Sequence, residues 1–266
     1  MNITTIIPIH KFDEKIGEYL KKAVESVKKQ EGVDELPKVV VVAPNDVLEH
    51  LVPLLQNDKY SNVSFIDNKG NTDYQSQVNL AVNLINTEYF SVLEFDDEYG
   101  NAFFKNAFTY VKAYPEVDVF LTMMIEVNGE NKAVKLTNET VWAQQFVGEN
   151  GEMGFLNLNA LKQFTDFKLS GAIIKKSEFE NLGGYKSNIK LTFMYEFLLR
   201  ALNNTCKIFS IPKIGYKHLA TREGSLFDEY QKSMSMEERK FWFDTAGKES
   251  NFTTDREIDM SWVLKK

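Results

Sequence analysis

The first hundred residues alternate between short runs of strand-forming residues and stretches with helical periodicity. The strand-forming runs cover residues 2–9, 38–43, 62–67 and 88–95. Between them lie stretches with helical character at 14–30, 45–56 and 73–86. Continuous apolar runs, rather than alternating ones, are typical of strands buried on both faces of a parallel sheet. The pattern therefore predicts a β-α-β-α-β-α-β unit in which helices cover both faces of the sheet.

Local signals mark the starts and inner faces of the predicted helices. Asn45 or Asp46 is the expected N-cap of the second helix, and Asp73 that of the third. The apolar positions of the third helix repeat at helical spacing and should face the sheet. They are Val78, Ala81, Val82 and Ile85.

The second half of the chain is less regular and predicts a mixed α+β arrangement. Helices are expected at 101–114 and 191–204, and strands at 117–127, 131–136, 168–176 and 206–212. The Asn128-Gly129 turn should join the first two of these strands as a hairpin. We expect one domain over residues 1–226, with halves at 1–98 and 99–226, and a helical extension over 227–266.

Charge and cysteine content narrow the functional classes. A formal net charge of −7 argues against a general electrostatic grip on nucleic acid. The single Cys206 and the lack of a secretory signal predict a reducing, cytoplasmic location. No apolar run reaches the roughly 18–20 residues that span a bilayer. The three histidines are far apart in sequence, which disfavours a zinc cluster.

Four acids directly follow the fourth predicted strand: Glu94, Asp96, Asp97 and Glu98. Open parallel sheets bind ligands at the carboxyl ends of their strands, so these acids are expected at the binding edge. Clustered carboxylates suit a hard divalent cation, Mn²⁺ or Mg²⁺, which normally keeps positions open for phosphate oxygens. The alternative is a solvated acidic turn that precedes the next helix.

The order of several segments resembles the family 2 glycosyltransferases, which have the GT-A fold. The segments are TTIIPIHKFDEKIGEYLKKAVESVKKQ (4–30), NKGN (68–71), TEYFSVLEFDD (87–97), GGY (183–185), EFLLRAL (196–202) and YKHLATREGSL (216–226). The resemblance extends over roughly residues 2–226. It implies a nucleotide-sugar half at 1–98, an acceptor half at 99–226, and sugar transfer from a nucleotide-diphosphate donor.

The resemblance also implies roles for individual residues. Asp96, alone or with Asp97, would bind the metal, and His218 would complete the metal or diphosphate site. Glu94 would hold a ribose hydroxyl or a metal-bound water. The remaining nucleotide-site residues implied by the resemblance are Pro8 and His10, which would line the pocket, and Asn79, which would steady the loop at its floor.

Two departures from the family pattern affect the expected chemistry. The two acids that usually follow the second strand are replaced by Ala43 and Pro44, so Asp46 or Asn45 would have to substitute. Where the family carries Glu-Asp, whose Asp is the general base, this chain has Phe193-Met194. General-base catalysis contributes about 10²–10⁴-fold, so this loss is serious.

The remaining candidates for the base are Glu196, Asp166 and Glu178. Glu196 lies two residues after Met194, roughly 200° around the helix, and should face away from the acceptor. A solvated helix face is its plain alternative.

Three functions stay open from the sequence. The first is a metal-dependent glycosyltransferase, the second a catalytically degenerate module that only binds, and the third a nucleotidyltransferase. The acceptor, whether glycan, lipid, protein or nucleic acid, is not specified. Trp142, Phe146 and Phe155 are expected to stack on a ligand ring or, more simply, to pack in the core.

Overall fold

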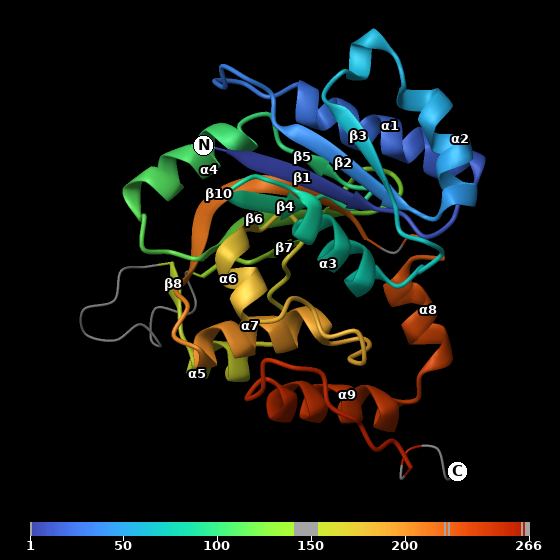
Figure 1. Ribbon diagram of the computed structural model, residues 1–266. Helices are drawn as coiled ribbons and strands as arrows, with labels where there is room; N and C mark the ends of the chain where they lie inside the picture. Colours follow the sequence, from blue (N-terminus) through green and yellow to red (C-terminus); the bar gives the residue numbers. More distant parts are fainter. Residues whose placement is uncertain (1, 141–153, 221, 223, 262, 264–266) are drawn as a thin grey trace.

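One mixed β-sheet of ten strands runs through the described part of the computed structural model, which comprises residues 2–140, 154–220, 222, 224–261 and 263. The strand order is β3-β2-β1-β4-β9-β6-β10-β5, with β7 paired to β6 and β8 paired to β10. The sheet curls between layers of helices (Figure 1). This α/β architecture confirms the predicted fold class, and the two halves share the sheet rather than forming separate bodies.

The first four strands form the predicted parallel unit. They are β1 (Ile3–Pro8), β2 (Lys38–Ala43), β3 (Val63–Asp67) and β4 (Tyr89–Val92). The β1–β2, β2–β3 and β1–β4 pairs are all parallel. Their carboxyl ends therefore meet at one edge of the sheet, which is where the acids after β4 emerge.

The helices between these strands cover opposite faces of the sheet (Figure 1). The helices α1 (Glu14–Lys28) and α2 (Asn45–Leu55) pack on one face, and α3 (Tyr74–Leu84) packs on the other. The Asp73 side chain caps α3 as predicted, accepting a hydrogen bond from the Ser76 amide at 2.8 Å. The predicted cap of α2 was wrong, because Pro44 is the N-cap and Asn45 is already helical.

The second half continues the sheet with mostly antiparallel neighbours. Its strands are β5 (Glu98–Tyr99), β6 (Val119–Val127), β7 (Ala133–Thr137), β8 (Phe155–Leu156), β9 (Ile173–Lys175) and β10 (Ile208–Leu219). The β6–β7 hairpin is confirmed, and β6 and β10 are parallel. The last strand continues past the predicted end at 212 as far as Leu219, which brings the segment around His218 beside β6.

The helices of the second half are α4 (Phe103–Ala113), α5 (Leu158–Gln163), α6 (Lys176–Asn181) and α7 (Phe193–Asn203). Two buried apolar clusters form the core, one on each face of the sheet. The strand β2 shows how, because Val40 and Val42 enter one cluster while Val39 and Val41 enter the other. This alternation explains why the strand reads as a continuous apolar run.

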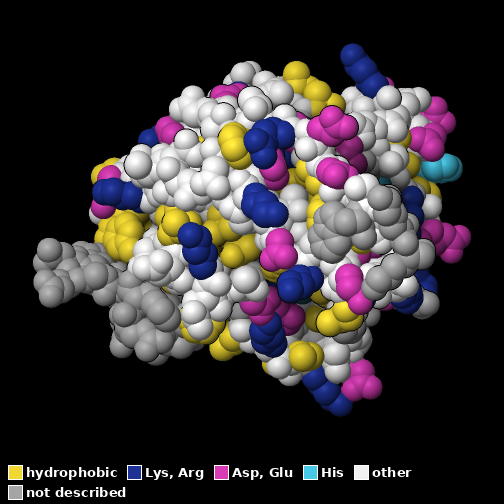
Figure 2. Space-filling model, turned by 90° about the horizontal axis from the view of Figure 1, so that it is seen from below, with side chains coloured by type: hydrophobic (Ala, Val, Ile, Leu, Met, Phe, Trp, Pro, Cys, Tyr) yellow, Lys and Arg dark blue, Asp and Glu magenta, His cyan; other side chains and the backbone are white. Residues whose placement is uncertain are grey.

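Beyond residue 226 the chain is helical up to Glu249, in α8 (Leu226–Ser233) and α9 (Met236–Glu249). The α9 side chains Phe241, Trp242 and Ala246 are buried in the cluster that also contains α7. The predicted helical character is therefore confirmed as far as Glu249, whereas residues 251–261 are not helical. The helix α9 is part of the core. Seen from the side of α9, acidic and basic side chains are interspersed over the surface (Figure 2).

Among the described residues, no helix combines the length and apolar character needed to cross a membrane.

Candidate functional site

Three acids converge where β4 ends. Carboxylate oxygens of Glu94, Asp96 and Asp97 lie within 4.8 Å of one another. The Asp97 amide donates to the Glu94 carbonyl at 3.0 Å, which folds the segment into a tight turn. Asp97 is only 1% exposed, so the alternative of a solvated acidic turn is wrong. We call these acids, together with His218 and Arg222, the edge cluster.

Asp97 is held by the end of β10. The Nδ1 atom of His218 lies 2.9 Å from Asp97 Oδ2, and the Leu219 amide donates to Asp97 Oδ1 at 2.8 Å. These contacts join residues about 120 positions apart in the sequence. They depend on the extension of β10 beyond residue 212, which places His218 at the same edge as β4.

Asp96 is paired with Arg222. The guanidinium Nε contacts Asp96 Oδ2, and the same guanidinium lies over the Phe95 ring at 4.9 Å. Both side chains are largely buried. Sequence reasoning did not single out Arg222, although it lies within the late motif that contains His218.

Glu94 is oriented from the loop before β9. The Ser170 hydroxyl donates to Glu94 Oε1 at 2.6 Å, and the Glu94 amide donates to the Tyr216 hydroxyl oxygen at 3.1 Å. No other hydrogen bond to the Glu94 carboxylate is made by the described residues, so Oε2 is available to a ligand.

Burial and mutual repulsion oppose ionisation of these acids. Burial raises the pKa of Glu94, Asp96 and Asp97, and the neighbouring carboxylates raise the pKa further. For His218 the balance is reversed. Burial lowers its pKa, but the Asp97 and Glu94 carboxylates outweigh burial and raise the pKa to about 9. The imidazole is therefore protonated at neutral pH.

The donor set fits a hard divalent cation. Three carboxylates face two cationic side chains, so negative charge is in excess, and carboxylate oxygens are the preferred ligands of Mg²⁺ and Mn²⁺. Burial and the neighbouring carboxylates raise the pKa of each acid, and a positive charge between the carboxylates would relieve their repulsion. His218 adjoins this site through its contact with Asp97.

The expected nucleotide-pocket residues differ in their position and exposure. Pro8 ends β1, and His10 lies half-buried just beyond it at the same edge as the acids. Burial and Lys11 lower the pKa of His10. The adjacent Lys11 lies 3.8 Å from Glu229, which brings α8 beside this loop. Asp46, in contrast, is exposed in the first turn of α2.

Asn79 serves the fold of the edge. Its Nδ2 donates to the Tyr185 carbonyl and its Oδ1 accepts from the Tyr185 amide, both at 2.8 Å. The two bonds fix the turn that contains Gly183 and Gly184, which both have positive φ. A side chain at Gly184 would collide with Asn79 itself. Asn79 therefore steadies a loop through backbone contacts.

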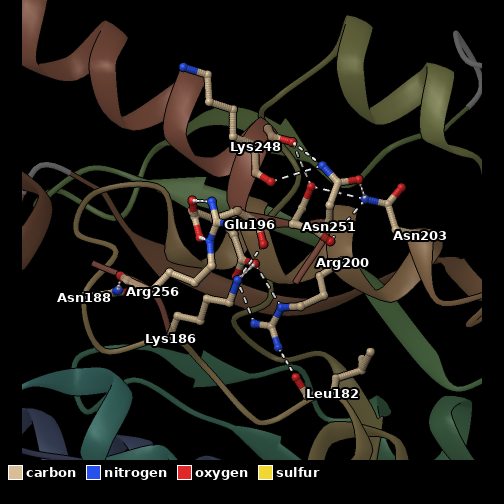
Figure 3. A network of polar contacts seen from close by, with 12 residues as sticks. Leu182, Lys186, Asn188, Glu196, Arg200, Asn203, Lys248, Asn251 and Arg256 are labelled. Carbon is tan, nitrogen blue, oxygen red and sulfur yellow. Dashed lines mark hydrogen bonds and ion pairs between the residues drawn. The ribbon is translucent and has the colours of Figure 1, made fainter. Parts of the chain in front are cut away.

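Glu196 is not the solvated side chain that the alternative predicted. It is fully buried between two cations (Figure 3). Lys186 Nζ lies 3.2 Å from Glu196 Oε1, and Arg200 Nη2 lies 2.9 Å from Oε2. Both cations also donate to backbone carbonyls, including Gly184 and Glu249. We call Lys186, Glu196 and Arg200 the interior cluster. Its carboxylate is fully engaged, so Glu196 as catalytic base is not supported.

Two other acids, Asp166 and Glu178, were candidates for the base. Asp166 is exposed and pairs with Lys135. Glu178 lies on α6 and is half-buried. Met194, at the position of the family's base, is partly buried against a core cluster. Phe193 before it is 4% exposed, and its ring centroid lies 5.3 Å from that of Tyr74 and 5.4 Å from that of Tyr185.

Two further polar groups lie near the edge, one on Tyr74 and one on Asn68 of the NKGN segment. The hydroxyl of Tyr74 and Nδ2 of Asn68 are buried and have no hydrogen-bond partner in the described part of the chain. Of the three acceptor-half aromatics, Phe155 packs against Tyr114 and Phe209, which confirms the core interpretation for it. Trp142 and Phe146 lie outside the described residues.

The family model described as glycosyl transferase family 2 matches residues 4–177, about two thirds of the chain. The chain belongs to this family. The match includes the first parallel strands, the acids after β4 and the segment up to β9. A search of curated protein sequences gave no significant match.

Solved structures of S. aureus TarS have a similar fold. A structure of TarS 1–349 in complex with UDP-GlcNAc is 18% identical, with a TM-score of 0.65 over 89% of this chain and 62% of that one. The complex of TarS 1–349 with UDP gives 18% identity and a TM-score of 0.64 over 87% of this chain and 63% of that one. Another TarS structure is 18% identical, with a TM-score of 0.62 over 87% of this chain. That TarS chain is longer, and the match spans only 38% of it. At this identity the likeness concerns the fold alone.

Proposed function

We propose that this chain transfers a sugar from a nucleotide-diphosphate donor to an acceptor, with a divalent cation bound at the edge cluster. The observation that carries the proposal is the convergence of three carboxylates, from Glu94, Asp96 and the buried Asp97, at the carboxyl end of β4 in a fold of this family. The donor class is supported by the TarS structures, which have a similar fold and contain UDP-GlcNAc or UDP. We infer residues 1–226 as the transferase unit and 227–266 as its extension.

In the proposed site, Asp96 and Asp97 hold the cation, and Glu94 holds a ribose hydroxyl or a metal-bound water. Glu94 suits this role because its Oε2 is open while Ser170 fixes Oε1. A bound Mn²⁺ or Mg²⁺ would neutralise the negative charge that develops on the leaving diphosphate. Pro8 and His10 line the nucleotide pocket in this proposal, and Asp46, exposed in the first turn of α2, substitutes for the acids that the family usually carries after the second strand.

The two cations of the edge cluster suit contact with phosphate. His218 uses Nδ1 for Asp97, so its protonated Nε2 can donate to a diphosphate oxygen. Arg222 contributes a second charge beside Asp96. A donor phosphate would add negative charge next to both side chains and so stabilise their charged forms. These contacts would orient the diphosphate and stabilise it as it leaves.

A second candidate is a module that binds a nucleotide sugar without turnover. The observation that favours it is Met194, an apolar side chain that lies at the position of the family's general base and packs against a core cluster. The acids of the edge cluster would then serve binding alone. The two candidates predict the same affinity for a nucleotide and differ in whether the donor is consumed.

A panel of nucleotide sugars, beginning with UDP-GlcNAc, tests the proposal. Each donor is incubated with the chain and Mn²⁺, and release of nucleoside diphosphate is measured, with and without chelator. Asp96→Ala should abolish both Mn²⁺-dependent nucleotide binding and donor hydrolysis. Asp34→Ala, in an exposed loop before β2, is the matched control and should change neither.

Three outcomes are informative. Slow Mn²⁺-dependent hydrolysis that is lost in Asp96→Ala supports the transferase. Mn²⁺-dependent binding without consumption of any donor supports the binding module. Nucleotide binding that is unchanged in Asp96→Ala would contradict the placement of the site.

A further inference from the structure

A sugar transfer needs a group that accepts the proton of the acceptor, and the usual position cannot supply one. Phe193 is buried among aromatic rings, and Met194 packs beside the same core cluster. Glu196 is paired with Lys186 and Arg200 in the interior cluster. Asp166 is exposed and forms an ion pair with Lys135. The base must therefore be sought among carboxylates that reach the edge cluster from other elements.

Glu126 is such a carboxylate. It is the penultimate residue of β6, and in the parallel β6–β10 pair it is the register partner of His218. His218 in turn contacts Asp97. Register partners on adjacent strands lie about 5 Å apart, so Glu126 is one strand away from the edge cluster on the side of the second half.

One carboxylate oxygen of Glu126 is fixed and the other is open. The Thr137 hydroxyl donates to Oε1 at 2.6 Å, and Lys168 Nζ lies 3.0 Å from the same oxygen. The Oε2 atom accepts no hydrogen bond from the described residues. It is not among their buried polar atoms that lack a hydrogen-bond partner. The side chain is 12% exposed. Because Thr137 and Lys168 both hold Oε1, the orientation of the carboxylate is fixed and Oε2 can accept a proton.

The same loop links Glu126 to Glu94. Lys168 binds Glu126, and Ser170, two residues later, donates to Glu94 Oε1 at 2.6 Å. Residues 168–170 thus orient one carboxylate in the edge cluster and another next to it. Burial opposes ionisation of Glu126, but Thr137 and Lys168 outweigh it and hold its pKa below the ordinary value. The side chain is therefore ionised, as a base must be before it accepts a proton.

We propose that Glu126 is the general base of the transfer, an inference that rests on the proposed function. Its Oε2 takes the proton from the acceptor hydroxyl while the hydroxyl oxygen bonds to the anomeric carbon of the donor sugar. The bond between that carbon and the diphosphate oxygen breaks, and its electron pair leaves with the nucleoside diphosphate. The products are the glycosylated acceptor, the nucleoside diphosphate and protonated Glu126, which returns the proton to water.

The test compares two attacking groups on the donor that the unsubstituted chain hydrolyses with Mn²⁺. Water must lose a proton as it attacks, whereas azide is already an anion and needs no base. Glu126→Gln should slow hydrolysis by about 10²–10⁴-fold, while azide-dependent donor consumption stays within a few-fold of the unsubstituted chain. Binding of UDP with Mn²⁺ and the thermal unfolding midpoint should be unchanged.

Glu116→Gln is the matched control, because Glu116 is exposed just before the other end of β6 and should leave all four measurements unchanged. Hydrolysis at the unsubstituted rate in Glu126→Gln would overturn the inference while the proposed function stands. Equal loss of hydrolysis and of azide-dependent consumption would also overturn it, since a structural or donor-binding role affects both. If the unsubstituted chain consumes no donor from the panel, the proposed function fails and this inference fails with it.

Discussion

The edge cluster and the interior cluster both bury charge, but they balance it differently. In the interior cluster one carboxylate, Glu196, faces two cations that also donate to backbone carbonyls. In the edge cluster three carboxylates face two cations, and the pKa of each acid is raised. The interior cluster is satisfied by the protein alone. The edge cluster keeps an excess of negative charge that a bound cation would neutralise.

The difference also follows from position. All three side chains of the interior cluster are at most 2% exposed, whereas the His218 side chain is 23% exposed. Charges that a ligand must reach have to lie at a surface, while charges that join α7 to the turn at Gly184 and to α9 do not. We therefore expect substitutions in the interior cluster to affect stability, and substitutions in the edge cluster to affect binding.

The largest effect is expected for Arg200→Met. Removal of this guanidinium leaves Glu196 buried with Lys186 as its remaining cation, and leaves the Leu182 and Gly184 carbonyls without that donor. Breaking a buried ion pair from one side costs about 3–5 kcal/mol of unfolding free energy. Urea unfolding followed by circular dichroism measures it. A loss below about 1 kcal/mol, the size of a surface pair, would remove the distinction between the clusters.

A smaller effect is expected from pH on the metal-free protein. The pKa of His218 is raised from 6.5 to about 9, so the folded state holds its proton more tightly than the unfolded state. The stabilisation is complete below pH 6.5 and is lost as the pH rises through about 9. Unfolding free energies at several pH values between 6 and 9.5 should show this decline, and His218→Gln should flatten it. An equal slope in both proteins would show that the Asp97–His218 contact contributes nothing.

Asp96→Asn should alter stability less than the interior substitution does. Burial and Glu94 disfavour ionised Asp96, so the neutral amide relieves repulsion while it weakens the contact with Arg222. Because these two effects oppose each other, we expect a change within about 1 kcal/mol in the metal-free protein. Urea unfolding under the same conditions gives the value. A loss as large as that of Arg200→Met would make the edge cluster a structural feature.

The smallest effect is expected for Asp166→Asn. Asp166 and Lys135 are both about half exposed, and water competes with such a pair. Exposed ion pairs contribute less than about 1 kcal/mol, so the unfolding midpoint in urea should hardly move. This variant gives the lower reference for both clusters, and a clear loss would show that exposure does not determine the cost of breaking a pair here.

The parts of the fold that local patterns determine could be predicted. The boundaries of β2 were predicted residue for residue, and the Asp73 cap of α3 was predicted from a single polar residue before an apolar helix. The acids after β4 were predicted to gather because the carboxyl ends of parallel strands meet at one edge. Each of these features depends on neighbouring residues or on a general rule of sheet topology.

The rest depends on contacts between distant segments. The burial of Glu196 required cations from positions 186 and 200, and helical periodicity alone assigned the acid to water; Arg200 four residues later was the available signal. The Asp96–Arg222 contact and the placing of Glu126 beside His218 depend on how far β10 extends and on its register with β6. Neither quantity can be read from the composition of the strand.

The proposed function depends above all on the edge cluster binding a divalent cation together with a nucleoside diphosphate. Electron paramagnetic resonance of Mn²⁺, titrated with the chain in the presence of UDP, tests it directly, because free and bound Mn²⁺ give different signals. We predict one bound Mn²⁺ per chain, and loss of that binding in Asp96→Asn while Asp34→Asn behaves as the unsubstituted protein. Equal Mn²⁺ binding in Asp96→Asn, or no binding to the unsubstituted chain, would contradict the account.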